Sequence, residues 1–299
     1  MRFLRPRTHP TVRGIAARRA HRTRCLMMPT HDTPTPGRRA PAEVVLLSAG
    51  PGALDLLTLR AVRELEAADV LLVDELVDPA IAGFAPGARL IRVGKRGGCR
   101  STPQAFICRL MRRYALRGLR VARVKGGDAL LFGRAGEEIA FLRAAGIEVR
   151  IVNGVSAGFA AAASLGVSLT HRDHCHGITF VTAHTHDHGE PDWAALAATG
   201  TTLAIYMGMR RAGALGAALR RHLPAATPVA IVQSASRPDE LRWLTTLAGL
   251  EDVADVLDPG APGVIFVGEA VGEASGRLPR PAVAARADAD LRGEALAFA

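Results

Sequence analysis

Several features that mark other protein classes are missing from this sequence of 299 residues. It has only four cysteines, no two of which form a C-x-x-C pair, so neither a disulfide framework nor a zinc ribbon is indicated. The motifs G-x-G-x-x-G and G-K-[ST] are absent, which argues against a dinucleotide site and a P-loop. No run of 18 apolar residues occurs. We therefore expect no membrane partner and a cytoplasmic location.

Acidic residues are nearly absent from residues 1–42. This segment holds ten of the 38 Lys and Arg residues but one of the 28 Asp and Glu residues, so the rest of the chain is almost neutral. It also has no serine and no apolar stretch of seven residues, which fits neither a transit peptide nor a secretory signal. Such a composition cannot build a core. We expect a disordered basic leader and no nucleic-acid partner for the folded body.

From residue 43 onward, short apolar runs alternate with Gly- or Pro-marked turns and helical spacings. The first run, residues 44–49, is followed by Gly50-Pro51-Gly52 and then by leucines at helical intervals. Thr102-Pro103 predicts the N-cap and first residue of a helix over 103–117. Further strand patterns lie at 70–73, 89–93, 120–124 and 148–152. This alternation predicts an α/β domain with a mostly parallel sheet.

A second series of strands follows residues 157–165. Strands are predicted at 178–182, 202–207, 229–232 and 264–267, helices at 192–198, 210–221 and 249–256, and an additional strand at 241–247 that would make this sheet mixed. We expect an N-terminal α/β domain over 43–154, a C-terminal α/β domain over 155–272 and a flexible tail over 273–299. Because no Ser/Gly-rich linker separates the halves, we expect them to pack together with the active site in the cleft between them.

One stretch, from Arg123 to Glu138, has the composition of a binding loop. It reads R-V-K-G-G-D-A-L-L-F-G-R-A-G-E-E, so an apolar run ends at a lysine, and two glycines then allow close approach of a ligand to the backbone. Two other polar residues, Asp74 and Lys95, follow the second and third predicted strands. In a parallel sheet both would stand at the carboxyl edge, where open α/β sheets bind ligands.

These motifs resemble those of the tetrapyrrole methylases. The binding loop is similar to the family's K-G-G-D-P-F-x-F-G-R-G-G-E-E, and L-S-A-G-P-G-A-L-D-L-L-T-L-R-A at 47–61 is similar to its opening V-G-A-G-P-G-D-x-x-L-L-T-L-K-A. Similar strings follow in order, including V-G-K-R at 93–96, L-T-H-R-D at 169–173 and Y-M-G at 206–208. The resemblance covers residues 43–272. Departures from the family pattern include Ser48, Ala129 and Asn153.

The resemblance implies S-adenosylmethionine as methyl donor and assigns roles to individual residues. Cofactor contacts are expected from Pro51, Gly126, Gly127, Asp128, Leu131, Ser156, Ala157, Met207, Ala230 and Ala235. Asp74 corresponds to a proton acceptor and Lys95 to a proton donor. A basic cleft for substrate carboxylates is expected from Arg96, Arg123, Lys125, Arg134 and Arg172.

The activity implied is C-methylation of uroporphyrinogen III to precorrin-2, by two methyl transfers, in a homodimer whose product feeds sirohaem or cobalamin synthesis. No metal is required, because a reduced pyrrole carbon attacks a sulfonium methyl group directly. An alternative in the same class is a later precorrin or cobalt-precorrin methylase. A different alternative is a nucleic-acid-binding protein that uses the basic leader, with the body as a degenerate ligand sensor.

Two histidine-rich stretches offer a metal-binding alternative. They read H-R-D-H-C-H at 171–176 and H-T-H-D-H at 184–188, and together they contain enough ligands for zinc. However, His171 and His184 lie inside strings that match the family, and the others fall in expected loops, where solvated histidines are common. We therefore expect no metal site.

Overall fold

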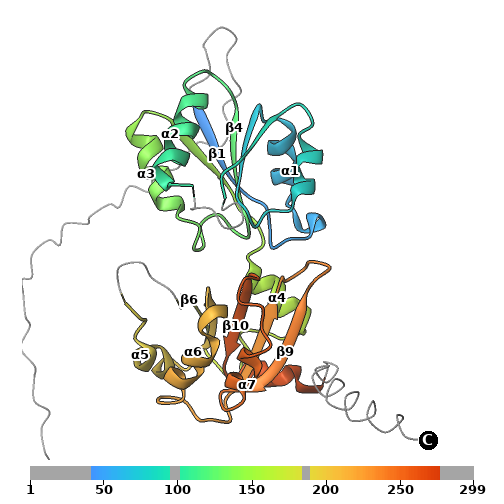
Figure 1. Cartoon of the computed structure of the whole chain (residues 1–299), viewed down its shortest axis with the longest axis vertical. Helices are drawn as coiled ribbons and strands as arrows, with labels where there is room; N and C mark the ends of the chain where they lie inside the picture. The colour runs from blue at the N-terminus through green and yellow to red at the C-terminus, as the bar shows by residue number, and fades with distance from the viewer. Residues whose placement is uncertain (1–41, 95–101, 184–188, 277–299) are drawn as a thin grey trace, which may run out of the picture. The chain divides into compact units, whose positions relative to one another are not determined.

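The computed structural model describes residues 42–94, 102–183 and 189–276. The expected leader therefore lies outside the described residues, except for Ala42, as do the predicted site residues Lys95 and Arg96. The described residues form two five-stranded sheets with helices on both faces, which confirms the predicted α/β class (Figure 1). Within these ranges no helix is long and apolar enough to cross a membrane.

The first sheet contains the five predicted N-terminal strands, and every neighbouring pair is parallel. Its order is β3-β2-β4-β1-β5. The strands are β1 (Glu43–Ser48), β2 (Val70–Val73), β3 (Arg89–Arg92), β4 (Val121–Lys125) and β5 (Glu148–Val152). Because β1, β2 and β4 are covered on both faces, their residues are almost all buried. This burial explains the nearly continuous apolar runs of β1 and β2, whereas β4 also buries Arg123 and Lys125.

Helices cover both faces of this sheet. Leu46 of β1 packs with α2 (Gln104–Ala115) and α3 (Ala135–Ala144), whereas its neighbour Leu47 packs with α1 (Leu59–Glu66) and the 3₁₀ helix η2 (Pro79–Phe84). A short 3₁₀ helix, η1 (Leu54–Leu56), precedes α1. Adjacent strands β1 and β4 thus lead into helices on opposite faces, α1 and α3. This is the topological switch point at which open sheets bind ligands beyond their carboxyl ends.

Helices α1 and α2 begin in different ways. The Thr58 hydroxyl accepts a hydrogen bond from the Ala61 N–H and caps α1. Helix α2 differs from the prediction, because Pro103 occupies the N-cap position and Thr102 does not cap the helix. The Thr102 hydroxyl instead donates to the carbonyl oxygen of Gly94, 3.3 Å away, just beyond β3.

The second sheet is mixed, as the additional strand predicts. Its order is β6-β7-β10-β8-β9, in which only β6 and β7 pair in parallel. The strands are β6 (Ile178–Thr182), β7 (Thr202–Tyr206), β8 (Pro228–Gln233), β9 (Leu241–Thr246) and β10 (Gly263–Val267). The helices α5 (Trp193–Ala198), α6 (Ala212–Leu219) and α7 (Leu250–Ala254) pack on one face, and η3 (Met209–Arg211) leads into α6.

The other face of this sheet is covered by α4 (Ala157–Leu165) and the 3₁₀ helix η4 (Glu269–Gly276). Helix η4 overlaps the start of the predicted flexible tail. Within it, Ala274 is fully buried against the sheet, so residues 273–276 belong to the fold. The sequence did not predict this because a single small residue on a short helix gives too weak a periodic signal.

Candidate active site at the carboxyl ends of the parallel strands

Two glycines join the loops that follow β1 and β4. The Gly50 N–H donates to the Gly127 carbonyl at 3.2 Å, and the Gly127 N–H donates to the Gly50 carbonyl at 2.7 Å. Both have positive φ, +72° and +65°, which favours glycine at these positions. The Ser48 hydroxyl strengthens the junction by accepting from the Ala129 N–H at 2.8 Å. The predicted binding loop is therefore held by the strand beside it.

The Asp128 carboxylate fixes the same loop to the connection between β5 and α4. One oxygen accepts from the Leu130 N–H at 2.9 Å and the other accepts from the Gly154 N–H at 3.0 Å. A Cβ on Gly154 would lie 2.5 Å from the Cβ of Ser48, so only glycine fits between the two loops. The sequence alone predicts no role for Ser48 or Gly154. The one signal in the sequence is that Ser48 departs from the family pattern at its position.

The hydroxyl of Tyr206, at the end of β7, caps helix α4. It accepts from the Gly158 N–H at 2.8 Å and lies 2.6 Å from the hydroxyl of Ser156. Ser156 occupies the N-cap position but makes no side-chain cap of its own. Burial raises the pKa of Tyr206, and these two hydrogen bonds oppose that rise. Tyr206 thus orders the backbone of Ser156 and Ala157, both predicted cofactor contacts.

We expect Tyr206→Phe to lower the free energy of unfolding by about 1–2 kcal/mol, because the buried Gly158 N–H loses its acceptor. Urea unfolding measures the effect as a shift of the midpoint at constant slope. A midpoint equal to that of the unmodified chain would contradict the capping role.

Backbone strain is concentrated in loops that contain predicted site residues. Among the described residues, five non-glycine residues have positive φ: Phe132, Arg134, Met207, Ser234 and Ser236. They lie in the binding loop, directly after β7 and directly after β8. Such conformations cost of order 1–3 kcal/mol each and tend to persist at ligand sites. Met207, with φ of 57° and 51% of its surface exposed, therefore remains a strong candidate for a cofactor contact.

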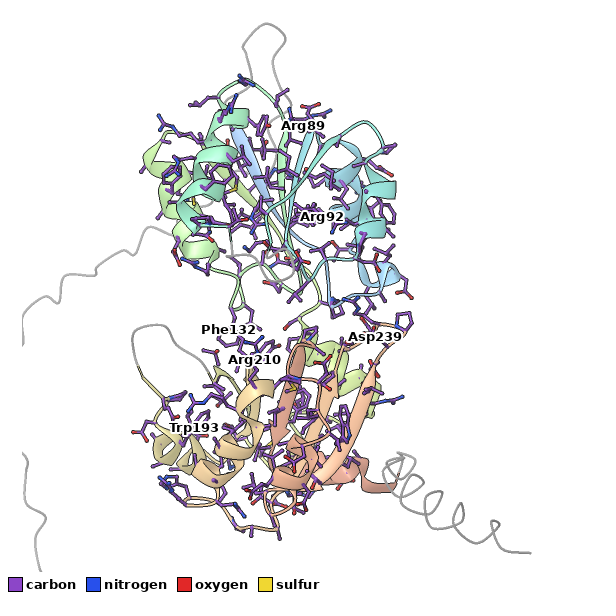
Figure 2. All side chains as sticks on the ribbon, in the orientation of Figure 1. Arg89, Arg92, Phe132, Trp193, Arg210 and Asp239 are labelled. Atoms are coloured by element: carbon purple, nitrogen blue, oxygen red, sulfur yellow. The ribbon has the colours of Figure 1, made fainter. Side chains whose placement is uncertain are left out.

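Two contacts join these loops to one another. The Ala53 N–H, after β1, donates to the hydroxyl of Ser236 at 3.1 Å. The ring of Phe132, at the tip of the binding loop in Figure 2, lies 5.0 Å from the ring of Tyr206 between centroids. The loop after β8, which also contains Ala235, is thus in contact with the segment that follows Pro51.

One predicted cofactor residue does not fit. Ala230 lies in the middle of β8, where it pairs with Phe266 of β10 and Leu244 of β9 and has no exposed surface. Its methyl group packs in the core with α4. A ligand could reach it only if the sheet opened, so we remove Ala230 from the predicted site and retain Ala235.

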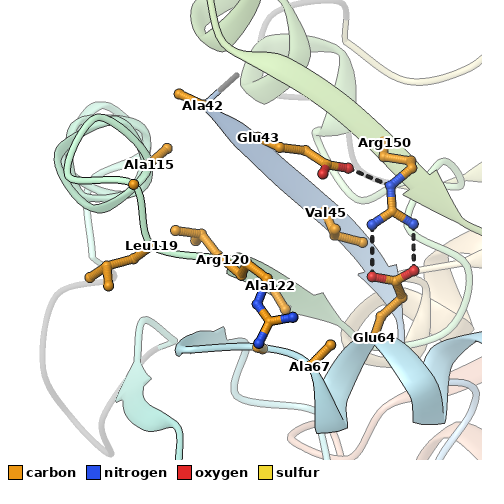
Figure 3. Close-up of a pocket in the computed structure, with 13 residues that line it drawn as sticks. Ala42, Glu43, Val45, Glu64, Ala67, Ala115, Leu119, Arg120, Ala122 and Arg150 are labelled. Atoms are coloured by element: carbon orange, nitrogen blue, oxygen red, sulfur yellow. Dashed lines mark hydrogen bonds and ion pairs between the residues drawn. The ribbon is translucent and has the colours of Figure 1, made fainter. Parts of the chain in front are cut away.

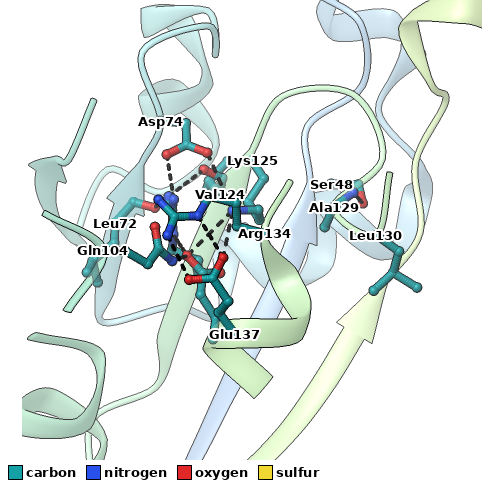
Figure 4. A network of polar contacts seen from close by, with 12 residues as sticks. Ser48, Leu72, Asp74, Gln104, Val124, Lys125, Ala129, Leu130, Arg134 and Glu137 are labelled. Carbon is teal, nitrogen blue, oxygen red and sulfur yellow. Dashed lines mark hydrogen bonds and ion pairs between the residues drawn. The ribbon is translucent and has the colours of Figure 1, made fainter. Parts of the chain in front are cut away.

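The two ends of the binding loop form a network of four charges with Asp74, and three of the four are buried (Figure 4). Arg123 of β4 is only 2% exposed and donates from Nε to Glu138 at 3.0 Å and from Nη2 to Asp74 at 2.5 Å. Its Nη1 group donates to the carbonyl oxygens of Leu72 and Val124, each at 3.2 Å. All the nitrogen atoms of this guanidinium are therefore occupied within the protein.

Lys125 completes the network. Its Nζ lies 3.5 Å from both carboxylate oxygens of Glu138 and 3.7 Å from Asp74. Gln104 of α2 donates to the same Glu138 at 2.9 Å, while the Oε2 atom of Glu138 accepts no hydrogen bond from the described residues and is balanced only by the lysine charge. Burial, and then the charge of Arg123, lower the pKa of Lys125, whereas Glu138 and Asp74 oppose that change.

Asp74 is the member of this network that faces outward. Its side chain is 31% exposed, compared with 0–4% for Arg123, Lys125 and Glu138. It follows β2 at the carboxyl edge of the sheet, as predicted. Two cations hold its oxygens in a fixed orientation, so a carboxylate with a defined position is presented where a ligand would bind.

The predicted basic cleft is only partly realised. Arg123 and Lys125 are buried and paired, which argues against direct contacts with substrate carboxylates. Arg134 is 59% exposed and forms an ion pair with Glu137 at 2.7 Å, so its guanidinium is accessible. Arg172 lies before the amino end of β6, whereas Met207 follows the carboxyl end of the parallel strand β7. The fold therefore places Arg172 at the opposite edge of this sheet.

A separate cavity of about 150 Å³ lies at the amino ends of the parallel strands (Figure 3). Arg150 spans it and pairs with both Glu43 and Glu64, and its hydrogen bond to Glu64 lowers the pKa of that carboxyl group. Its lining includes none of the predicted site residues. Because Arg150, Glu43 and Glu64 pair with one another and the cavity lies at the opposite end of the strands from the predicted site residues, we do not assign the reaction to it.

Comparisons with known proteins agree with this geometry. The family described as Tetrapyrrole (Corrin/Porphyrin) Methylases matches residues 43–251. A uroporphyrinogen-III C-methyltransferase of Pseudomonas aeruginosa is 47% identical over 228 residues, which are 76% of this chain and 93% of that protein.

Two solved structures are also similar. A uroporphyrin-III C-methyl transferase of Thermus thermophilus complexed with S-adenyl homocysteine is 36% identical, with a TM-score of 0.67 over 77% of this chain and 98% of that one. A cobalt precorrin-4 methyltransferase is 26% identical, with a TM-score of 0.71 over 78% and 98% of the two chains.

Proposed function

This chain belongs to the tetrapyrrole methylase family, and we propose that it transfers two methyl groups from S-adenosylmethionine to carbon atoms of uroporphyrinogen III, forming precorrin-2. The observation that carries this proposal is the combination of 47% identity to a uroporphyrinogen-III C-methyltransferase with an ordered binding loop beside an outward-facing Asp74. The product would serve sirohaem or cobalamin synthesis.

The described loops fit S-adenosylmethionine. A Cβ added to Gly126 or Gly127 would make only ordinary van der Waals contacts, at 3.5 Å and 3.8 Å, so neither position is crowded by the protein itself. Leu130 and Met207 are each about half exposed, which suits contacts with an adenosine and a thioether or sulfonium chain. Pro51, Leu131, Ser156, Ala157 and Ala235 complete the proposed contacts, while Asp128 shapes the loop through its two backbone hydrogen bonds.

When bound, S-adenosylmethionine supplies an electrophilic methyl group to the electron-rich pyrrole carbon. The protein aligns the reactants and handles the charge that follows. Asp74, oriented by Arg123, stabilises the cationic ring and then accepts the proton that the ring must lose. Lys95 is proposed as the proton donor and Arg96 as a substrate ligand, from the family resemblance alone, because both lie outside the described residues. Arg134 is proposed as a further substrate ligand.

Gly126→Ala is expected to weaken S-adenosylmethionine binding at least tenfold, about 1.4 kcal/mol, because the new methyl group enters the proposed cofactor space. The fold should tolerate it, since its Cβ would be 3.5 Å from Leu76. Gly127 is less suitable because its φ of +65° makes any side chain strained. Gly136→Ala, in α3 and with nothing within 4 Å, is the matched control. Equal calorimetric affinities for the two variants would exclude Gly126 from the site.

A competition assay separates this proposal from the alternative within the family. Uroporphyrinogen III and a precorrin or cobalt-precorrin that already carries at least two methyl groups are supplied at equal concentration with S-adenosylmethionine, and the methylated product of each is followed by its mass. We expect turnover with uroporphyrinogen III to dominate. Preferred turnover of a cobalt-precorrin would instead assign the chain to the later methylases, such as the cobalt precorrin-4 enzyme that shares its fold.

We further propose that the enzyme acts in the cytoplasm as a homodimer and that the methyl transfer uses no metal. The family resemblance supports the dimer, and direct attack of a pyrrole carbon on a sulfonium methyl group needs no Lewis acid. Light scattering of the full chain after size-exclusion chromatography measures the oligomeric state, and a mass equal to one chain would contradict the dimer.

A further inference from the structure

At the amino end of β6, the fold brings together three groups that suit a metal ion. His171 and His174 lie between α4 and β6, and Glu273 lies in η4, about 100 residues later. One ligand atom from each residue lies within 4.8 Å of the other two. This arrangement differs from the expectation of no metal site, because a carboxylate from a segment about 100 residues away lies beside the two histidines and is invisible in the local sequence.

The local backbone orients both histidines. The N–H groups of His174 and Cys175 each donate to the carbonyl oxygen of His171 at 3.0 Å, which closes a helical turn. Residues three apart in such a turn lie on one side. The two imidazole rings are accordingly 4.7 Å apart between centroids, and Nε2 of His174 lies 3.0 Å from a carboxylate oxygen of Glu273. Ordering these side chains therefore costs little when an ion binds.

The distances suit a first-row transition metal. Ligand atoms at about 2.0–2.2 Å from a tetrahedral zinc ion lie roughly 3.3–3.6 Å from one another. His174 and Glu273 approach each other at 3.0 Å, slightly closer than this range, and all three ligand atoms lie within 4.8 Å of one another, so small side-chain rotations bring them to it. Two imidazoles with one carboxylate are a donor set that favours zinc and its neighbours over magnesium or calcium.

The solvent exposure and the neighbouring residues of the three ligands also fit a metal ion. His174 and Glu273 are exposed and His171 is half-buried, so an ion can enter from solvent and water can fill the remaining position. The Nδ1 atom of His171 accepts a hydrogen bond from the Asp173 N–H at 3.3 Å, which helps to hold this ring in place. Cys175 is not a ligand, because its sulfur faces the Leu169 carbonyl and the Thr202 hydroxyl, each at 3.4 Å.

We infer that His171, His174 and Glu273 bind one divalent transition-metal ion of the zinc class and that this ion ties the turn between α4 and β6 to η4. The site is distinct from the reaction site. It lies at the amino end of β6, whereas Met207 and Ala235 follow the carboxyl ends of β7 and β8, which run in the same direction. Five strand residues span about 16 Å. The ion therefore stabilises the fold and takes no part in methyl transfer.

The test is a calorimetric titration of the full chain, without any added histidine tag, with zinc chloride. We expect one ion per chain at the highest-affinity step and a rise in melting temperature, because the ion binds the folded state. His174→Ala and Glu273→Gln should each weaken this step at least tenfold and remove the thermal shift. Cobalt(II) in place of zinc should give visible absorption bands that report its coordination.

Three controls make the result specific. His222→Ala changes an exposed histidine in another loop and should bind zinc like the unmodified chain. Simultaneous replacement of His184, His186 and His188 by alanine should also leave this step unchanged. His174→Ala should keep its methyltransferase turnover, because the ion takes no part in the reaction. If the metal were catalytic, this variant would lose turnover. Absence of zinc binding, or unchanged affinity in His174→Ala, would overturn the inference.

Discussion

Asp74→Asn is expected to lower the single-turnover rate of methylation by roughly 100-fold or more, with little change in affinity for S-adenosylmethionine. The amide keeps the size of the carboxylate and can still accept a hydrogen bond from Arg123, so the fold should be preserved. It cannot accept the proton that the methylated ring must lose, and it offers no negative charge to the cationic ring. Rapid quenching of the reaction, with enzyme in excess over substrate, measures the rate.

The matched control is Asp78→Asn, four residues along the same segment. Asp78 caps η2 by accepting from the Ala80 N–H at 2.8 Å, and asparagine serves equally well as a cap. Its rate should remain within about twofold of the unmodified chain. A full rate in Asp74→Asn would eliminate Asp74 as the base, although the methyltransferase assignment would stand.

Glu138→Gln is expected to lower the free energy of unfolding by about 3–5 kcal/mol, because it removes one charge from a buried and balanced network. Arg123 and Lys125 would then share only Asp74, and their burial prevents water from compensating the lost charge. The loss should also displace Asp74 through Arg123, so the turnover rate should fall together with the stability. Urea unfolding and single-turnover kinetics measure the two effects.

The adjacent residue offers a close control. Glu137 lies in the same first turn of α3 but is exposed, and its ion pair within the described residues is with exposed Arg134. Glu137→Gln should therefore cost less than about 1 kcal/mol. A double variant, Arg123→Met with Glu138→Leu, should recover much of the stability lost in Glu138→Gln, since apolar side chains can replace a buried ion pair. If Glu138→Gln and Glu137→Gln were equally stable, the network would not be a major support of this fold.

The strands and the carboxyl-edge location of Asp74 could be predicted because each depends on local pattern. Buried parallel strands read as apolar runs, and the strand direction alone places the ends at one edge. The role of Arg123 could not be predicted in this way. Its partners Asp74 and Glu138 lie 49 and 15 residues away on other elements, so an arginine inside a matching motif looked like a substrate ligand.

Three other roles could not be predicted either, because they also depend on how distant segments come together. Ala230 lies within a strand that the sequence predicted correctly, but the sequence did not show that both sides of this strand are paired and buried. The sequence predicts Arg172 as a substrate ligand together with the other basic residues of the family motifs, because position in the sequence does not show at which edge of the second sheet a residue lies. Tyr206 lies in a recognisable motif, whereas its capping of α4 depends on a helix whose N-cap residue, Ser156, lies 50 residues earlier.

The most direct test of the proposed function is the mass of the product formed from uroporphyrinogen III and S-adenosylmethionine with a fully deuterated methyl group. The predicted result is a tetrapyrrole that carries two deuterated methyl groups, with two molecules of S-adenosylhomocysteine released for each. This product should be absent without enzyme. Uroporphyrinogen III recovered unchanged, from protein that is folded and binds S-adenosylmethionine, would contradict the proposed function.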